Sequence, residues 1–313
     1  MQNNLTKKEI DNLYNWAKKY DIKELKTKDK NKLLNIKELT LGELFRAEKN
    51  FSYIPNEIFK LVNLKELYIN SINLKALPKD IGNLINLEEL VIGSNCKLKK
   101  LPKEIGKLTN LKKLEISYEK SNELPKELFN LTNLKEFEIR SENLEKLPKE
   151  ICNFSKLENI EIACENLKEL PHEIGNLKKL KYFTLWESNL KKFPKEFGNL
   201  INLESFRIYS CILKEFPKEL KNFTKLRYLT IECYKMKELP REIGNLINLK
   251  SLHIKSANLK ELPKEIKNLV NLERIDIIWD GYAKELPNEI LNFEKLKFIE
   301  IKKTGFIYKS FGR

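Results

Sequence analysis

Residues that usually carry chemistry are scarce in this 313-residue sequence, which has only two histidines and ten glycines. The histidines, His172 and His253, lie far apart in the chain. No glycine-rich phosphate loop, metal-ligand spacing or nucleophile motif is present. The sequence therefore predicts a protein that is not an enzyme, with no catalytic residue, no metal and no cofactor.

Cysteine is also sparse, and a secretory signal is lacking. Five cysteines, an odd number without Cys-x-x-Cys spacing, stand at positions 96, 152, 164, 211 and 233. The first eight residues contain no apolar core of the kind found in signal peptides, and no apolar run approaches the length of a membrane span. We therefore expect a cytoplasmic protein with five free thiols. Export without a conventional signal peptide is the alternative.

Acidic residues are outnumbered, and the formal net charge is +14. Much of the excess is lysine that follows a proline, and most of these lysines are followed at once by an acid, as in Lys79-Asp80 and Lys195-Glu196. Alternating signs are typical of a solvated surface rather than a track for phosphates. No RNA-reading motif is present. The sequence thus argues against nucleic acid as a partner and allows weak attraction to acidic ones.

The prolines are few but regularly spaced, with intervals of 23 residues, or 24 in two places. A fixed period in this range is the signature of a solenoid built from one repeated unit. Such a stack has a long, regular surface, which suits binding better than chemistry. All eleven prolines belong to the series: Pro55, Pro78, Pro102, Pro125, Pro148, Pro171, Pro194, Pro217, Pro240, Pro263 and Pro287.

Each repeat changes its apolar period half-way. In the segment that begins at Leu64, the apolar residues Leu67 and Ile69 alternate with outward positions. This period of two predicts a short strand whose apolar side chains face inward. After the proline, apolar residues recur every third position, as at Ile81 and Leu84, which predicts a short α- or 3₁₀-helical turn that the proline begins. The same pattern predicts that Leu180 and Leu185 are fully buried.

The phrase Leu-Pro-x-x-Ile-Gly-Asn-Leu-x-x-Leu-x-x-Leu-x-Leu resembles the leucine-rich repeat family, in its 23-residue intracellular type. It recurs at least ten times between about Ile36 and Ile301. The resemblance implies an α/β fold, a right-handed solenoid shaped like a horseshoe. About twelve parallel strands would line its concave side, with short helical or 3₁₀ turns on its convex side. Partners would bind the concave face.

The ends differ from the repeats, which divides the chain into three parts. Residues 1–35 are predicted to form a helical cap, 36–301 the uninterrupted solenoid, and 302–313 a tail. Thr6-Lys7-Lys8-Glu9 is a capping-box sequence that predicts a helix from about Thr6 to Tyr20 with Trp16 turned inward. A basic amphipathic helix lying on a membrane surface is the alternative for this segment.

The tail is apolar. Phe306, Ile307 and Phe311 are expected to fold over the last core layer. Otherwise they would leave an apolar edge for self-association. A monomer is the first expectation.

One family position departs from the pattern. The family places Asn three residues after the strand, where its side chain bonds to neighbouring backbone. Here that position holds residues such as Ile72, Glu142 and Tyr234, and Asn tends to follow one residue later, as at Asn73 and Asn258. The asparagine ladder is either shifted by one residue or largely absent.

Outward positions on the strands provide the candidate binding site. In the first half of the chain they carry acids, and from Tyr182 onward they are rich in aromatic residues and arginine, which are enriched at binding hot spots. The predicted partner-binding residues are Tyr182, Trp186, Arg207, Tyr209, Tyr228, His253, Lys255, Arg274 and Trp279. A secondary acidic patch comprises Glu115, Glu136, Glu138 and Glu161.

Three of these residues are expected to lie together. Trp186, Tyr209 and Tyr228 occupy outward positions on consecutive predicted strands, which predicts one aromatic patch with Arg207 among its rings. The sequence thus favours a scaffold that binds a protein or peptide. A bacterial surface or effector protein that binds a host partner is the second hypothesis. A binder of nucleic acid or anionic surfaces is the third.

Overall fold

The computed structural model describes the chain except for residues 1–4, 43–49, 95, 97, 119–121, 211, 280–292, 304–305 and 313. Of residues 118, 210, 279, 301–303 and 306–312 it describes only the backbone. The chain forms two compact units. The first comprises Met1–Leu144 and Asn153–Leu157, and the second Glu145–Cys152 and Glu158–Arg313. The domain boundaries proposed from the sequence remain a prediction.

The first unit opens with the predicted helix, α1 (Lys7–Tyr20). The Thr6 hydroxyl accepts a hydrogen bond from the Glu9 backbone N–H, and the Glu9 carboxylate accepts one from the Thr6 backbone N–H, which completes the capping box. Trp16 is buried and its ring meets the Phe51 ring edge-on at 5.3 Å. Because the apolar face of α1 packs inside the protein, it is not free to lie on a membrane.

Strands and short 3₁₀ turns alternate after the helical segment. The remaining elements of the first unit are η1 (Lys23–Leu25), α2 (Lys30–Leu34), β1 (Glu38–Leu41), η3 (Asn56–Lys60), β2 (Glu66–Ile69), η4 (Lys79–Asn83), β3 (Glu89–Ile92), η5 (Lys103–Lys107), β4 (Lys113–Tyr118), η6 (Lys126–Asn130) and β5 (Glu136–Ser141). The paired strands are parallel and consecutive.

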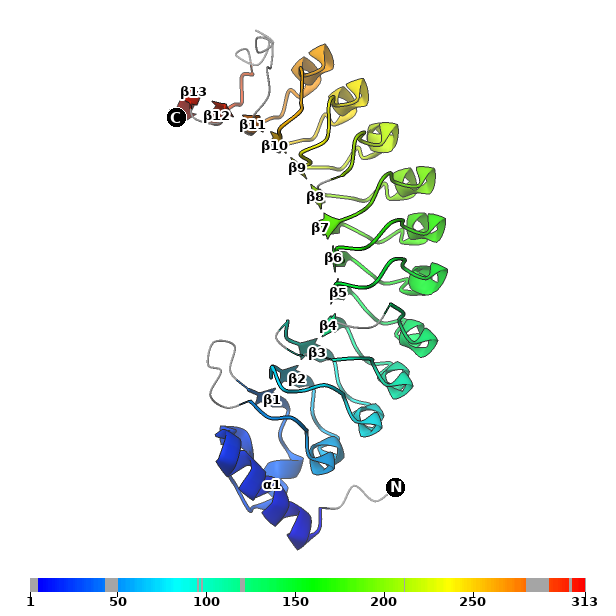
Figure 1. Ribbon diagram of the computed structural model, residues 1–313, viewed down its shortest axis with the longest axis vertical. Helices are drawn as coiled ribbons and strands as arrows, with labels where there is room; N and C mark the ends of the chain where they lie inside the picture. Colours follow the sequence, from blue (N-terminus) through cyan, green and yellow to red (C-terminus); the bar gives the residue numbers. More distant parts are fainter. Residues whose placement is uncertain are drawn as a thin grey trace. The chain divides into compact units, whose positions relative to one another are not determined.

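The second unit continues the alternation, with strands on one side and turns on the opposite side (Figure 1). Its strands are β6 (Asn159–Ala163), β7 (Tyr182–Ser188), β8 (Ser205–Ser210), β9 (Tyr228–Glu232), β10 (Ser251–Ser256), β11 (Arg274–Trp279), β12 (Phe298–Lys303) and β13 (Phe306–Gly312). The turns are η7 (Lys149–Asn153), whose last residue belongs to the first unit, η8 (His172–Asn176), η9 (Lys195–Asn199), η10 (Lys218–Asn222), η11 (Arg241–Asn245) and η12 (Lys264–Asn268).

The twelve parallel strands expected from the sequence, β1 to β12, are confirmed. The sequence did not predict β13, which turns back and pairs antiparallel with β12. The covering role expected of Phe306, Ile307 and Phe311 concerns side chains that lie outside the described part of the chain.

Each of the ten prolines from Pro55 to Pro263 precedes its turn instead of starting it. Pro78, for example, occupies the N-cap, with ψ of 146°, and its carbonyl accepts the first 3₁₀ bond from the Ile81 N–H at 3.1 Å. The expectation of proline at the first helical position is therefore wrong by one residue. The 3₁₀ turn needs the proline carbonyl as its first acceptor, and proline keeps that group although it lacks an N–H.

The apolar repeat positions form the core, and Leu180 and Leu185 are fully buried as predicted. In the second unit phenylalanines thicken this core beneath β7 and β8. The Phe183 ring lies 5.0 Å from Phe197 and 5.7 Å from Phe206, both edge-on. Edge-to-face packing of this kind adds to the stabilisation from burial and gives these two strands a firm base.

The side chains at the family's asparagine position point outward. Ile72 and Tyr234 are about 40% exposed, and the inward position one residue earlier holds a small buried group, as at Ser71 and Cys233. Within the described part of the chain, the asparagines that bond regularly to neighbouring backbone stand just before the strands. Asn86 Nδ2 donates to the Val62 carbonyl at 2.9 Å.

Six further asparagines at this place also donate to a backbone carbonyl: Asn63, Asn110, Asn133, Asn202, Asn248 and Asn271. At three places where lysine replaces asparagine, its ammonium group donates to the asparagine side chain of the previous repeat. Lys225 Nζ, for example, lies 2.7 Å from Asn202 Oδ1. An asparagine ladder therefore lies at the corner before many of the strands, a place that the sequence prediction did not include. Asn258, at the position shifted by one residue, donates to the Tyr234 carbonyl and is an instance of the predicted shift.

Candidate partner-binding face

The outward side chains of the second unit form three rows across its strands, because the parallel register aligns equivalent repeat positions. We call this surface the sheet face. The tyrosine row is Tyr182, Ser205, Tyr228, Ser251 and Arg274; the central row is Glu161, Thr184, Arg207, Thr230, His253 and Asp276; the aromatic row is Ala163, Trp186, Tyr209, Glu232, Lys255 and Ile278. Successive strands lie about 4.8 Å apart, so neighbours within a row are close enough to interact.

Trp186 and Tyr209 are stacked. Their ring centroids are 4.0 Å apart and their planes differ by 4°. Both side chains are half-buried, and Trp186 Nε1 lies 3.4 Å from a Glu161 carboxylate oxygen. The stack presents an ordered aromatic surface to the solvent.

A β-bulge follows Trp186. The register between β7 and β8 shifts between Trp186 and Ser188, and the intervening Glu187 has φ of 37°. The left-handed region is strained for a residue other than glycine. The bulge ends the regular pairing directly beyond the stack, as bulges do at many functional sites.

Tyr228 does not join this stack. It pairs in register with Ser205, four residues before Tyr209 on the same strand, which is about 13 Å along β8. Tyr182 stands on the other side of Ser205, and both tyrosines are about 45% exposed. The expectation of one patch containing Trp186, Tyr209 and Tyr228 is therefore corrected, because residues that are both outward can still lie at opposite ends of neighbouring strands.

A polar cluster continues the sheet face beyond Tyr209. His253 Nδ1 is 3.0 Å from Asp276 Oδ2, and His253 Nε2 is 3.4 Å from Glu232 Oε1. Lys255 Nζ is 3.8 Å from Glu232 Oε2. The site prediction included the histidine and the lysine but missed both acids. Their spacing of 23 residues, Asp276 from His253 and Lys255 from Glu232, was a signal that could have found them.

Electrostatics on the sheet face are mixed. Burial raises the pKa of Tyr209, the Glu232 carboxylate raises it further, and Arg207 opposes this shift. Arg207 is exposed and has no ion-pair partner among the described residues. Arg274 stacks on the Phe298 ring with its guanidinium carbon 3.9 Å from the centroid. The side chain of Trp279 lies outside the described part of the chain.

A sequence model of the leucine-rich repeat region matches residues 15–146 and 137–242, well over half of the chain. The chain belongs to the leucine-rich repeat family. This confirms the family seen in the sequence. Members of this family are typically non-enzymatic scaffolds that bind proteins or peptides. No curated protein sequence matches the chain.

Solved structures of leucine-rich repeat proteins share the fold. A leucine-rich repeat protein of Leptospira interrogans is 28% identical, with a TM-score of 0.62 over 87% of this chain and 85% of that one. An internalin from Listeria monocytogenes is 18% identical, with a TM-score of 0.58 over 92% and 95%. A plant peptide hormone receptor, RGFR1 in complex with RGF2, is 23% identical, with a TM-score of 0.56 over 85% and 51%.

The predicted secondary acidic patch of this leucine-rich repeat protein is largely balanced by neighbouring cations. In the first unit Glu115 pairs with Lys113 at 2.8 Å, and Glu138 pairs with Arg140 at 2.6 Å. Glu136 is exposed, and Glu161 belongs to the second unit. The acids of the first unit are therefore weaker candidates for attracting a cation than their sequence suggested.

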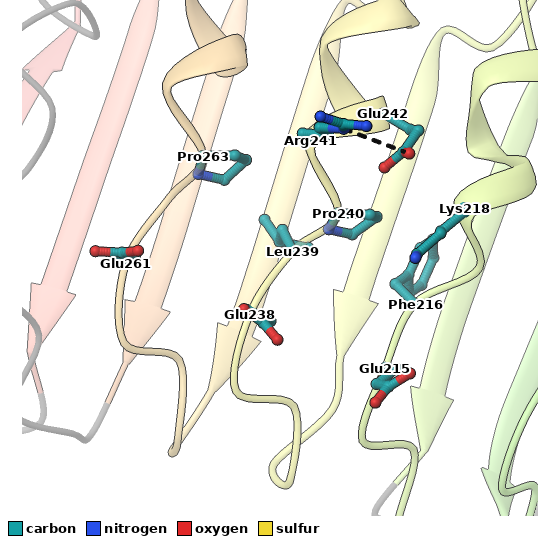
Figure 2. A pocket seen from close by; sticks show the side chains of 10 residues that line it. All are labelled: Glu215, Phe216, Lys218, Glu238, Leu239, Pro240, Arg241, Glu242, Glu261 and Pro263. Carbon is teal, nitrogen blue, oxygen red and sulfur yellow. Dashed lines mark ion pairs between the residues drawn. The ribbon is translucent and has the colours of Figure 1, made fainter.

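A pocket of about 420 Å³ lies on the flank of the repeats (Figure 2). Glu215, Glu238 and Glu261 stand at matching places on three neighbouring repeats, and Pro240 leads into the turn that begins at Arg241 (Figure 2). Because the lining comes from positions that recur in the repeats, we read it as the groove between repeats rather than as a site with its own chemistry.

The described part of the chain has neither a cluster of metal ligands nor a membrane-spanning helix. No group of three or more histidine, cysteine, aspartate or glutamate residues there could hold a metal ion. None of its helices is long and apolar enough to cross a membrane.

Proposed function

We propose that this leucine-rich repeat protein is a non-enzymatic scaffold that binds a protein or peptide through the sheet face of its second unit. The observation that carries the proposal is the stacked pair of Trp186 and Tyr209. Half-buried aromatic residues on a firm base lose little side-chain entropy on binding and commonly serve as anchors. The pair lies above the phenylalanine-rich core, which supports its order.

The remaining predicted residues would surround this anchor. Tyr182 and Tyr228 are exposed in the tyrosine row, and Arg207 lies between that row and the stack. His253, Lys255, Arg274 and Trp279 extend the surface along β10 and β11. A plant peptide hormone receptor of the same fold was solved in complex with RGF2, which supports a protein or peptide as the class of partner.

We further propose that the protein acts as a monomer in the bacterial cytoplasm. The cysteines at 96, 152, 164 and 233 are all free, which suits a reducing compartment. The 28% identity with the Leptospira protein supports a bacterial origin.

Affinity capture from the native lysate tests the proposed face. Replacing Trp186 and Tyr209 together with Ala should weaken partner binding at least about 100-fold, because aromatic anchors often contribute about 2 kcal/mol or more each. The melting temperature should change little, since neither ring belongs to the core. Quantitative mass spectrometry of proteins retained by the wild type and by the double variant provides the comparison.

Lys195→Glu is the matched control on the turn side of the second unit, where Lys195 is exposed in η9. It should retain the partners that the aromatic variant loses. Normal capture by the aromatic variant, together with loss of capture by Lys195→Glu, would refute the proposed face.

A further inference from the structure

The stacked pair has one open ring face. The two rings cover each other across β7 and β8, so the second face of Trp186 is directed toward β6. There its register partner is Ala163, whose side chain is a single methyl group. On the β6 side the indole ring is therefore bordered by a small side chain rather than by a second ring.

Carboxylates stand at both ends of the stack. Glu161, two residues before Ala163 on β6, contacts Trp186 Nε1 at 3.4 Å and has no ion pair among the described residues. Glu232 is the register partner of Tyr209 on β9. Asp276 lies further from the stack, on the other side of His253 from Glu232. Its Oδ1 is buried and has no hydrogen-bond partner in the described part of the chain. Glu161 and Asp276 Oδ1 therefore have unused hydrogen-bonding capacity, which is costly when they are partly desolvated, whereas Glu232 is engaged by His253 and Lys255.

Most cations of the sheet face are already engaged. Lys255 lies near Glu232 and over the Tyr234 ring at 5.6 Å. Arg274 stacks on Phe298. Arg207 alone among them has no ion-pair or ring partner within the described residues. Glu161 is the acid of the face that has no ion pair among the described residues, and it adjoins the Trp186 ring, so this spot offers an unused carboxylate although the whole chain carries a charge of +14.

We propose that the sheet face receives a basic segment of its partner, with an arginine or lysine side chain against the open face of Trp186 and paired with Glu161. This inference rests on the proposed function and specifies the partner's chemistry. Cations bind tryptophan faces favourably, and a nearby carboxylate adds a charge-assisted hydrogen bond. Arginine fits best, since its planar guanidinium can stack and donate in the same pose.

Fluorescence anisotropy with two labelled peptides, tetra-arginine and tetra-glutamate, tests the proposal on the full chain at about 50 mM salt, where charge interactions are weakly screened. Wild-type protein should bind tetra-arginine more tightly than tetra-glutamate. Glu161→Gln should weaken tetra-arginine binding about 5-fold or more, in keeping with a desolvated cation–π contact and ion pair. Arg207→Gln should leave it unchanged or strengthen it. Equal melting temperatures will establish that the variants are folded.

Glu238→Gln is the control for long-range charge, because it makes the same charge change on the flank of the second unit. It should change tetra-arginine affinity less than 2-fold. A preference for tetra-glutamate, or equal losses in Glu161→Gln and Glu238→Gln, would overturn the inference. If that happens while the double variant at Trp186 and Tyr209 still releases captured partners, the proposed function stands and only the partner's chemistry is wrong.

Discussion

Single acidic residues link neighbouring repeats, because one carboxylate forms ion pairs with lysines of the repeats before and after it. Glu88 pairs with Lys65 at 2.8 Å and also with Lys112, so one carboxylate joins three successive repeats. Hydrogen bonds from Lys112 and then Lys65 lower the pKa of Glu88 to about 2. Glu273 is held in the same way between Lys297 and Lys250, which lower its pKa. Exposed ion pairs are individually weak, but this arrangement recurs.

Acid should therefore destabilise the first unit through Glu88. Its pKa in the folded protein lies below the ordinary value of 4.5, so its contribution to stability is present above pH 4.5 and is lost as the pH falls through about 2. The carboxyl of Glu88 should titrate by NMR with a midpoint near 2. Denaturation of Glu88→Gln should depend less on pH across this window than denaturation of the wild type.

Glu204 is the matched control, since it occupies the same repeat position and has no ion pair among the described residues. The variant Glu204→Gln should keep the wild-type response to acid. The role assigned to Glu88 is wrong if both substitutions change the pH dependence equally.

At the scale of elements, the strands and turns are joined by a ladder that the family pattern did not indicate. The side-chain amide of the asparagine before a strand donates to a backbone carbonyl of the preceding repeat. That carbonyl lies at the corner after a 3₁₀ turn and accepts no bond within the turn. Lysine at the same place reaches the preceding asparagine instead. The family's usual position is free to carry exposed residues because the ladder lies elsewhere.

Removing one rung should cost about as much as a typical intramolecular hydrogen bond contributes. Asn248→Ala deletes the bond from Asn248 Nδ2 to the Thr224 carbonyl, 2.7 Å long, and should lower the free energy of unfolding by about 0.5–1.5 kcal/mol. Lys225→Ala should cost less, because its bond joins two side chains, both of which lose rotamer freedom when it forms. Urea denaturation of both variants measures the difference. A larger loss for Lys225→Ala would contradict the ladder as a source of stability.

At the scale of the whole molecule, cysteine chemistry bears on the compartment. Cys96, Cys164 and Cys233 are buried, whereas Cys152 is half-buried. Burial raises the pKa of Cys96, an effect that the Ser71 backbone N–H partly offsets. A raised pKa reduces the thiolate fraction at neutral pH and slows reaction.

A thiol titration should return five free thiols in denaturant. In the native protein Cys152 should react faster than Cys96, Cys164 and Cys233. Three or fewer thiols in denaturant would indicate disulfides and overturn the cytoplasmic assignment.

The sequence by itself determined the repeat, the twelve parallel strands, the buried leucines and the capped first helix. These features follow from local periodicity and from contacts within a few residues, so a pattern in the chain is enough to predict them. It also indicated that aromatic and basic residues gather on outward positions from Tyr182 onward.

Only the tertiary structure decided which outward residues are neighbours. The register placed Trp186 against Tyr209 and moved Tyr228 to another row, and it brought Glu232 and Asp276 to His253. It also revealed the bulge at Glu187 and the relocated asparagine ladder. These contacts join residues about one repeat apart, and they depend on strand register, side-chain rotamers and the direction of each hydrogen bond. None of these is encoded in the apolar period alone.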